Sequence, residues 1–316
     1  MKRGRSFVGT FVLLAAAACQ GRGPAEPRAG PRIALVLKTP NNPFFIDMQR
    51  GAEEAARRLG VRLVVQSPER EIDVEKQMQI VENLVETGVA ALCIAPASSK
   101  GIVPALAKAN AAGIPIVVVD DEVDAAAAAE AGVSTDSYVG SDNVEGGRLA
   151  GRHLVMASGG RAKVAVLEGI PGHETGDSRL KGFHDAVKGA PGVTVVASQT
   201  ANWERDQGFT VFQNMLQAHP EIDALFACSD MMALGAVEAI AAAGKTGKIR
   251  VIGFDAVDDA RKAIAAGTIL ASVAQFPSEM GRLAVEDAVK LIRGEKPEPE
   301  QKVRIELVTK ATLSEK

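Results

Sequence analysis

Short runs of apolar residues alternate with amphipathic segments along the chain from residue 32 onward. The runs are rich in β-branched residues and mostly apolar at every position, which is typical of strands buried on both faces of a sheet. The segments between them carry apolar residues at helical spacing. This alternation predicts an α/β fold with parallel sheets covered by helices on both sides. The predicted strands are 33–37, 62–66, 91–94, 116–119, 163–167, 194–197, 224–227 and 250–253.

These units fall into two sets, 32–140 and 141–275. A single hydrophobic core stops growing at ~250–300 residues. This chain has 316 residues, 47% of them hydrophobic. Two similar lobes, each a doubly wound parallel sheet, are therefore expected.

The first 18 residues have the pattern of an export signal. Three basic residues lie within the first five, and an apolar run over 6–18 ends in four alanines. The run is too short to span a bilayer, and small residues of this kind precede a cleavage site. Cys19 comes next, so the run resembles a bacterial lipoprotein box, although Ala16 stands where that box usually has Leu. The alternatives are lipidation of Cys19, or ordinary cleavage that leaves an incidental thiol.

Residues 19–31 are rich in proline and poor in apolar residues, which predicts a flexible tether. The expected location is outside the cytoplasm, in the periplasm or at the cell surface. Contact with the membrane is expected only through a lipid anchor on Cys19.

The sequence has no signature of a cofactor, a metal site or a nucleic-acid-binding surface. No phosphate-binding glycine loop follows the first strand, where residues 38–45 read KTPNNPFF, and no GxSxG turn occurs. The four histidines are scattered and no CxxC pair is present, which argues against structural zinc. A formal net charge of −3 provides no basic footprint. Cys93 and Cys228 are interpreted as buried free thiols, with a disulfide as the alternative.

Ligands of open α/β sheets bind beyond the carboxyl ends of the strands. The candidate binding residues are therefore polar and aromatic residues that follow predicted strands or begin helices of the second set. They are Lys38, Asn42, Phe44, Phe45, Asp120, Asp121, Asp177, Trp203, Ser229, Asp255 and Gln275. Carboxylates, amides and a lysine can bond to hydroxyl groups, and aromatic rings cover C–H faces, a combination that suits a sugar. Three or four such bonds, at ~1.5–3 kcal/mol each, suffice for micromolar binding.

Six stretches, in order along the chain, resemble the ribose-type periplasmic sugar-binding proteins. They are VLKTPNNPFF (36–45), GSDNVEGGRLAG (140–151), ASQTANWERDQG (197–208), HPEIDALFACSDMMALGA (219–236), VIGFDAVDDARKAI (251–264) and VAQFPSEMGRLAV (273–285). The resemblance implies two lobes joined by three crossings, with a sugar in the cleft. We expect the crossings near 139–142, 274–276 and 303–306. The N-terminal lobe would then comprise 32–140 and 276–304, and the C-terminal lobe 141–275 and 305–316.

The resemblance also implies ligand contacts at particular positions, which here are Asn42, Phe45, Asp120, Trp203, Asp255 and Gln275. Compared with the ribose-specific pattern, Asp121 and Asp177 replace two arginines, Lys38 replaces Ser, and Ala95 and Ser229 replace Asn. Lys38, Ala95 and the two acidic residues are closer to the D-allose-binding members. Those members have Trp at the position of Phe45 and Asn at that of Ser229, so the match to them is incomplete.

Several candidates also have a structural interpretation. Asn42 precedes a proline and could cap a helix. Phe44 suits the core better than its neighbour does, and Asp121 and Asp177 could be ordinary surface charges. Arg179 is interpreted as structural, because the family keeps Arg-x-x-Gly-Phe whatever the ligand.

The expected function is that of the extracytoplasmic solute-binding component of an ABC sugar importer. Its partners would be a monosaccharide (an allose-like or other hexose, a pentose or a polyol) and a membrane permease, and the chain would be a monomer without catalytic activity. Ligand would shift the lobes from an open to a closed arrangement. The alternatives are a sensor that presents its sugar to a chemoreceptor or histidine kinase, and a carbohydrate-active enzyme with a carboxylate pair.

Overall fold

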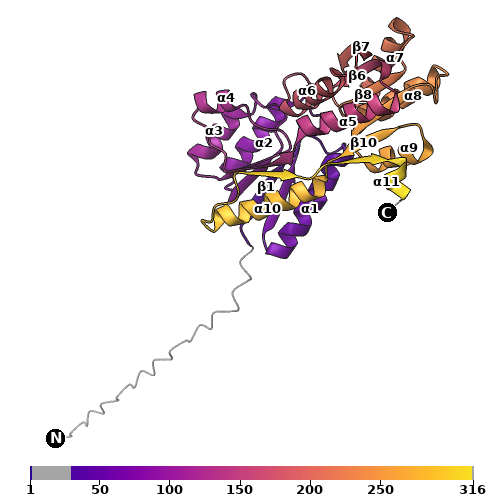
Figure 1. Ribbon diagram of the computed structural model, residues 1–316. Helices are drawn as coiled ribbons and strands as arrows, with labels where there is room; N and C mark the ends of the chain where they lie inside the picture. The colour runs from indigo at the N-terminus through magenta and orange to yellow at the C-terminus, as the bar shows by residue number, and fades with distance from the viewer. Residues whose placement is uncertain (2–29, 315–316) are drawn as a thin grey trace.

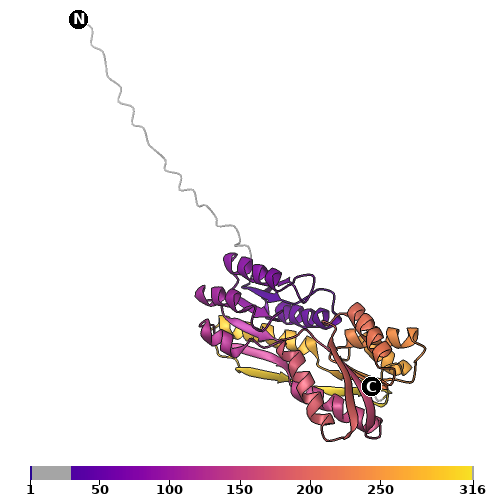
Figure 2. The same cartoon turned by 90° about the horizontal axis from the view of Figure 1, so that it is seen from above.

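The computed structural model describes Met1 and residues 30–314, and it shows two α/β lobes side by side (Figures 1 and 2). The predicted export signal, Cys19 and the tether up to residue 29 lie outside the described residues, Met1 apart. None of the helices within the described part combines the length and the apolar character that a membrane span requires.

The first lobe is built on a six-stranded sheet whose neighbours are all parallel, in the order β11-β5-β4-β3-β1-β2. Its strands are β1 (Arg32–Val36), β2 (Arg62–Gln66), β3 (Ala91–Ile94), β4 (Ile116–Val119), β5 (Ser137–Ser141) and β11 (Glu300–Val303). Its helices are α1 (Pro43–Leu59), α2 (Val74–Glu86), α3 (Val103–Ala111), α4 (Ala125–Glu130) and α10 (Pro277–Ile292).

The second lobe repeats this plan in the order β12-β10-β9-β8-β6-β7, with β12 antiparallel to β10 and the other neighbours parallel. Its strands are β6 (Arg161–Glu168), β7 (Gly192–Thr200), β8 (Ala224–Ala227), β9 (Arg250–Asp255), β10 (Ala271–Ala274) and β12 (Glu306–Thr309). Its helices are α5 (Asn143–Ala157), α6 (Glu174–Val187), α7 (Arg205–Ala218), α8 (Asp230–Ala242), α9 (Asp258–Ala266) and α11 (Lys310–Ser314).

Helices cover both faces of the first sheet, which explains why its central strands are apolar at every position. Successive residues of a strand point to opposite faces. In β1, Ile33 and Leu35 join the core cluster formed with α1 and α10, whereas Ala34 and Val36 join the cluster formed with α2 and α3. The predicted fold, two lobes of parallel sheet with helices on both sides, is confirmed.

Four strands were not predicted from the sequence: β10, a short apolar strand of four residues, and the three strands β5, β11 and β12. The last two are edge strands, and their sequences EQKV and ELVT mix charged and apolar residues because they are only partly buried. The β5 sequence SYVGS is buried but contains a glycine and two serines. A search for apolar runs therefore passes over all three.

The chain passes between the lobes three times: after Ser141, between Ala274 and Pro277, and between β11 and β12. The second crossing contains Phe276, whose φ of 60° lies in the left-handed region that non-glycine residues rarely adopt. The guanidinium of Arg304, in the third crossing, lies 3.9 Å from the centroid of the Phe276 ring. This cation–π contact joins two of the three crossings.

Close helix packing fixes α6, which carries several residues of the site described below. A Cβ atom on Gly147 of α5 would lie 2.1 Å from the carbonyl oxygen of Arg179 in α6. A Cβ on Gly182 of α6 would lie 1.9 Å from the carbonyl oxygen of Val144 in α5. The two backbones therefore approach closely at two glycines, which holds the first turns of α6 in place against α5.

Candidate functional site

A cavity with an empty volume of about 320 Å³ lies between the lobes, at the carboxyl ends of the strands. Both lobes contribute to its wall, which combines charged, amide, hydroxyl and aromatic side chains. The lining residues are Lys38, Asn42, Phe44, Phe45, Glu71 and Asp120 of the first lobe and Thr175, Arg179, Trp203, Ser229, Asp255 and Gln275 of the second.

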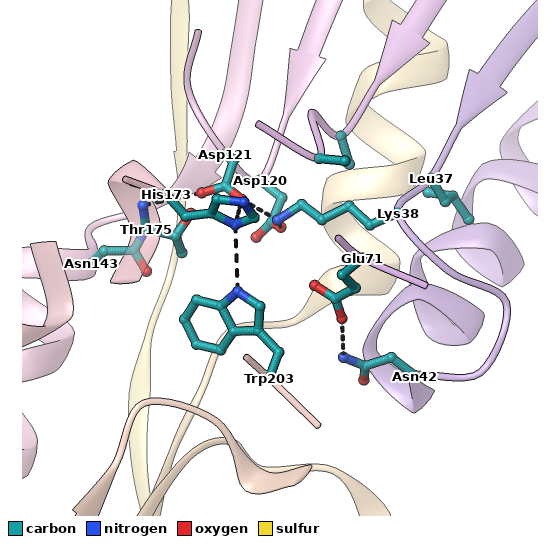
Figure 3. A network of polar contacts seen from close by, with 12 residues as sticks. Leu37, Lys38, Asn42, Glu71, Asp120, Asp121, Asn143, His173, Thr175 and Trp203 are labelled. Carbon is teal, nitrogen blue, oxygen red and sulfur yellow. Dashed lines mark hydrogen bonds and ion pairs between the residues drawn. The ribbon is translucent and has the colours of Figure 1, made fainter. Parts of the chain in front are cut away.

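Asn42 serves two purposes at once. Its Oδ1 atom accepts a hydrogen bond of 3.1 Å from the amide of Phe44 and so caps α1. Its Nδ2 atom donates to Oε1 of Glu71 at 3.1 Å, which orients that carboxyl beside the cavity (Figure 3). Phe44 and Phe45 are both buried, with ring centroids 5.2 Å apart in an edge-to-face arrangement, and both line the cavity as well as the core.

Lys38 lies between two neighbouring carboxylates, as Figure 3 shows. Its Nζ atom donates to Oδ2 of Asp121 and lies 3.2 Å from Oδ2 of Asp120. Burial acts to lower the pKa of Lys38, but the two carboxylates outweigh it and raise that pKa above its usual value. Burial and the adjacent carboxylate raise the pKa of Asp120. Burial acts to raise the pKa of Asp121, but the charge of Lys38 and the hydrogen bonds from Lys38 and Thr175 outweigh it and hold that pKa below its usual value.

Asp255 and Gln275 form the equivalent polar group of the second lobe. The Nε2 atom of Gln275 donates to Oδ1 of Asp255 at 2.6 Å, and Nη1 of Arg179 lies 3.8 Å from the same oxygen. Burial raises the pKa of Asp255 to about 7, against the effect of the nearby guanidinium. Two buried polar atoms next to the cavity, Oε1 of Gln275 and Oγ1 of Thr175, have no hydrogen-bond partner among residues 30–314. Unpaired buried polar atoms are costly, so these two are free to bond to a ligand.

Arg179 both supports the site and reaches its surface. Its Nε atom donates to Oδ1 of Asn143 at 2.9 Å and its Nη1 atom to the carbonyl of Cys228 at 2.8 Å. Its guanidinium lies 3.9 Å from the ring centroid of Phe254 and 5.6 Å from that of Trp203. The structural interpretation from sequence was therefore incomplete, because Arg179 also lines the cavity.

Trp203 packs against the backbone of its own lobe. A Cβ atom on Gly169 would lie 1.9 Å from Cζ2 of the indole, so the ring needs the glycine beside it. The indole Nε1 donates to Nδ1 of His173 at 3.4 Å. Burial and the charge of Lys38 lower the pKa of His173 to about 4, so the imidazole is neutral at physiological pH.

Backbone strain is concentrated around the cavity. Six non-glycine residues of the described part have a positive φ in the left-handed region, and three of them, Asp120, Trp203 and Asp255, line the cavity. The other three are their neighbours Asn202 and Ala256, and Phe276, which follows Gln275. Residues held in such conformations cluster at functional sites. The strained positions are thus gathered in and beside this cavity.

Two of the predicted site residues lie elsewhere. Asp121 is fully buried beside Lys38 and does not line the cavity. Asp177 is exposed, in a separate surface hollow next to Lys181. Ser229 does line the cavity, and its Oγ atom also caps α8 by accepting from the amide of Met232.

The sequence analysis missed Glu71 and Thr175. Glu71 lies in the loop after the edge strand β2, five residues beyond that strand, and Thr175 is in the first turn of α6. Neither directly follows a strand. The cysteines are as expected: Cys93 and Cys228 are buried and free. Within residues 30–314 no group of three or more histidine, cysteine or acidic residues could hold a metal ion.

Comparisons with known proteins agree with this architecture. Residues 33–296 match the family described as periplasmic binding protein domain. The ribose import binding protein RbsB of Escherichia coli is 38% identical over 95% of this chain and 97% of its own length. The D-allose-binding periplasmic protein of the same species is 37% identical over 80% of this chain and 82% of its own.

A crystal structure is similarly close. The periplasmic solute-binding protein of an ABC transporter from Actinobacillus succinogenes, with bound D-allose, superposes with a TM-score of 0.86. It is 39% identical, and the match covers 90% of this chain and 100% of that one. The family predicted from the sequence is confirmed: the chain belongs to the periplasmic binding proteins.

Proposed function

We propose that this chain is the sugar-binding component of an ABC importer and that its lobes close on a single monosaccharide. The observation that carries the proposal is the cavity between the lobes, where two buried polar atoms, one of Thr175 and one of Gln275, lack partners within the described part of the chain. A ligand rich in hydroxyl groups satisfies both, because each hydroxyl donates one bond and accepts others.

The cavity wall suits the two kinds of surface that a sugar presents. Carboxyl groups of Glu71, Asp120 and Asp255 can accept from hydroxyl groups, and aromatic rings of Phe45 and Trp203 can cover C–H faces. These groups come from both lobes, so only the closed arrangement makes all the contacts. Ligand therefore shifts the population towards closure.

The charges around the cavity favour a neutral ligand. Lys38 is paired with two carboxylates, and Arg179 lies beside Asp255. Both cations that line the cavity already have carboxylate neighbours, and burying an unpaired anion there would be costly. We therefore propose a neutral aldose of the D-allose or D-ribose kind, and not a uronic acid or a sugar phosphate.

We further propose that the protein performs no chemistry on its ligand. A glycosidase needs one carboxylic acid and one free carboxylate on either side of the scissile bond. Here Asp120 is tied to Lys38, and Asp255 is tied to Gln275 and Arg179. Fixed acceptors of this kind orient hydroxyl groups. The sugar would pass unchanged to a membrane permease from a monomeric receptor, exported and anchored through a lipid on Cys19.

Isothermal titration calorimetry of the purified protein tests this function. D-allose, D-ribose, D-glucose, D-galactose, myo-inositol and D-glucuronate are titrated separately. At least one neutral sugar should bind with micromolar affinity or better, D-glucuronate should not bind, and NMR after prolonged incubation should recover the sugar unchanged. Absence of binding across the panel, or conversion of the bound sugar, would contradict the proposal.

A further inference from the structure

The helix α6 of the second lobe begins without a capping side chain of its own. Its N-cap residue, His173, makes no side-chain hydrogen bond to the first turn. The first turn of a helix has backbone amides without partners inside the helix, and a side-chain oxygen usually satisfies one of them. The acceptor here comes from the other lobe. Oδ1 of Asp121 accepts from the amide of Thr175 at 3.0 Å (Figure 3).

We infer that Asp121 is a positioning residue that clasps the two lobes together by capping α6 across the cleft, before any sugar binds. Its carboxylate is fully buried, yet it does not line the cavity. Oδ1 bonds to Thr175 of the second lobe, and Oδ2 bonds to Lys38 of the first. One oxygen of this carboxylate is bonded to each lobe. Asp121 therefore connects the two lobes, and other side chains bind the sugar.

The electrostatics favour this bridge in the ionised form. A negative charge at the N-terminus of a helix is stabilised by the helix dipole as well as by the hydrogen bond. Lys38 fixes the rotamer of Asp121 and neutralises its charge without any contribution from a sugar. The side chain of Asp121 is therefore already oriented towards the second lobe. Closure of the cleft then requires little further ordering of this side chain.

His173 adds a second contact across the cleft. Its ring faces the first lobe, and its Nδ1 lies 3.7 Å from Oδ2 of Asp121. The same ring accepts from the indole of Trp203. When the lobes come together through Asp121 and His173, the ring of Trp203 is therefore also held in its place in the cavity wall.

The consequence is a closed population in the ligand-free protein. Opening the cleft breaks the bond between Asp121 and Thr175 and leaves the first turn of α6 uncapped. Losing a helix cap of this kind changes an equilibrium by about tenfold. The inference rests on the hinge closure in the proposed function but not on the identity of the sugar, so it is tested without ligand.

The test compares wild type with Asp121→Ala by small-angle X-ray scattering and by amide hydrogen exchange, both without sugar. The variant should show a larger radius of gyration and about tenfold faster exchange at Thr175. Asp177→Ala is the matched control, because it removes an exposed acidic residue from the first turn of the same helix and leaves the bond between Asp121 and Thr175 in place. It should behave as wild type does.

Two results would overturn the inference: Asp121→Ala as compact and as protected as wild type, or Asp177→Ala opening equally. If circular dichroism shows that Asp121→Ala is unfolded, the same exchange measurement is made on Asp121→Asn instead. Its amide oxygen can still accept from Thr175 but carries no charge, so exchange at Thr175 should accelerate by a smaller factor. Unchanged exchange at Thr175 in this variant would also contradict the inference that Asp121 connects the lobes. Failure here with sugar binding intact would leave the proposed function standing.

Discussion

The side-chain amide of Asn42 donates a hydrogen bond of 3.1 Å to the buried carboxyl of Glu71, and this contact joins the cap of α1 to the wall of the sugar cavity. Glu71 is only 8% exposed, and burial raises its pKa from 4.5 to about 7, although the charge of Lys38 acts in the opposite direction. The protein therefore holds an ionisable acceptor in its binding site that titrates near neutral pH.

Glu71 should make the folded protein less stable as the pH rises. Between pH 4.5 and about 7 the folded carboxyl binds a proton that the unfolded one has lost. The free energy of unfolding should fall through this window and level off above it, with a contribution from Glu71 of at most about 3 kcal/mol. Glu71→Gln should reduce the slope in urea unfolding across a pH series, and the exposed Glu54→Gln should not. An unchanged slope in Glu71→Gln would disprove this assignment.

Gly169→Ala should impair sugar binding although no sugar contact is removed. The added Cβ would lie 1.9 Å from the Trp203 ring, so the ring must move out of its place in the cavity wall. We expect a loss of affinity of more than tenfold in calorimetry, with a shifted emission maximum of this single tryptophan. Gly189→Ala, where an added Cβ meets nothing within 4 Å, is the matched control. Equal affinities in the two variants would contradict the role given to the ring.

Asp255→Ala should weaken binding of the same sugar by more than tenfold. The change removes an acceptor from the cavity and leaves Gln275 without its 2.6 Å partner. Losing a hydrogen bond to a charged group costs ~1.5–3 kcal/mol, which corresponds to this loss or more. Asp258→Ala, an exposed residue in the first turn of α9, should bind as wild type does. The comparison is made by calorimetry at one pH.

Arg179→Lys should destabilise the fold as well as the site. Lysine cannot bond at once to Asn143 and to the carbonyl of Cys228 while stacking on Phe254, as the guanidinium does. Leaving these buried groups unpaired should cost about 2–4 kcal/mol in urea unfolding. Arg148→Lys, at a half-exposed ion pair, should change stability by less than about 0.5 kcal/mol. Equal losses in the two variants would refute the prediction.

The fold was predictable because strands that are buried on both faces of a sheet are apolar at nearly every position, which gives recognisable apolar runs in the sequence. Nine of the eleven predicted site residues line the cavity for a related reason, since most of them follow strand ends that meet in the cleft. Glu71 and Thr175 could not be found by that rule. Their place depends on how a loop and a helix of different lobes come together, which is a tertiary property.

Asp121 shows a different limit of sequence analysis. It directly follows Asp120, and neighbouring residues of an extended segment point in opposite directions. Which of two adjacent carboxyl groups faces the cavity depends on the left-handed backbone at Asp120, with its φ of 70°. A local pattern of residue types does not determine that conformation, because even aspartate, which adopts it more often than most residues, does so at few positions.

The three crossings also determine what a fragment of this protein can be. The first sheet needs β1, at residue 32, and β11, which ends at residue 303. The shortest continuous segment that contains the whole first sheet therefore already includes five of the six strands of the second. Neither lobe is therefore encoded by one uninterrupted segment of the gene. The two lobes must move apart to admit a sugar, yet each of them is built from stretches of chain on both sides of the other.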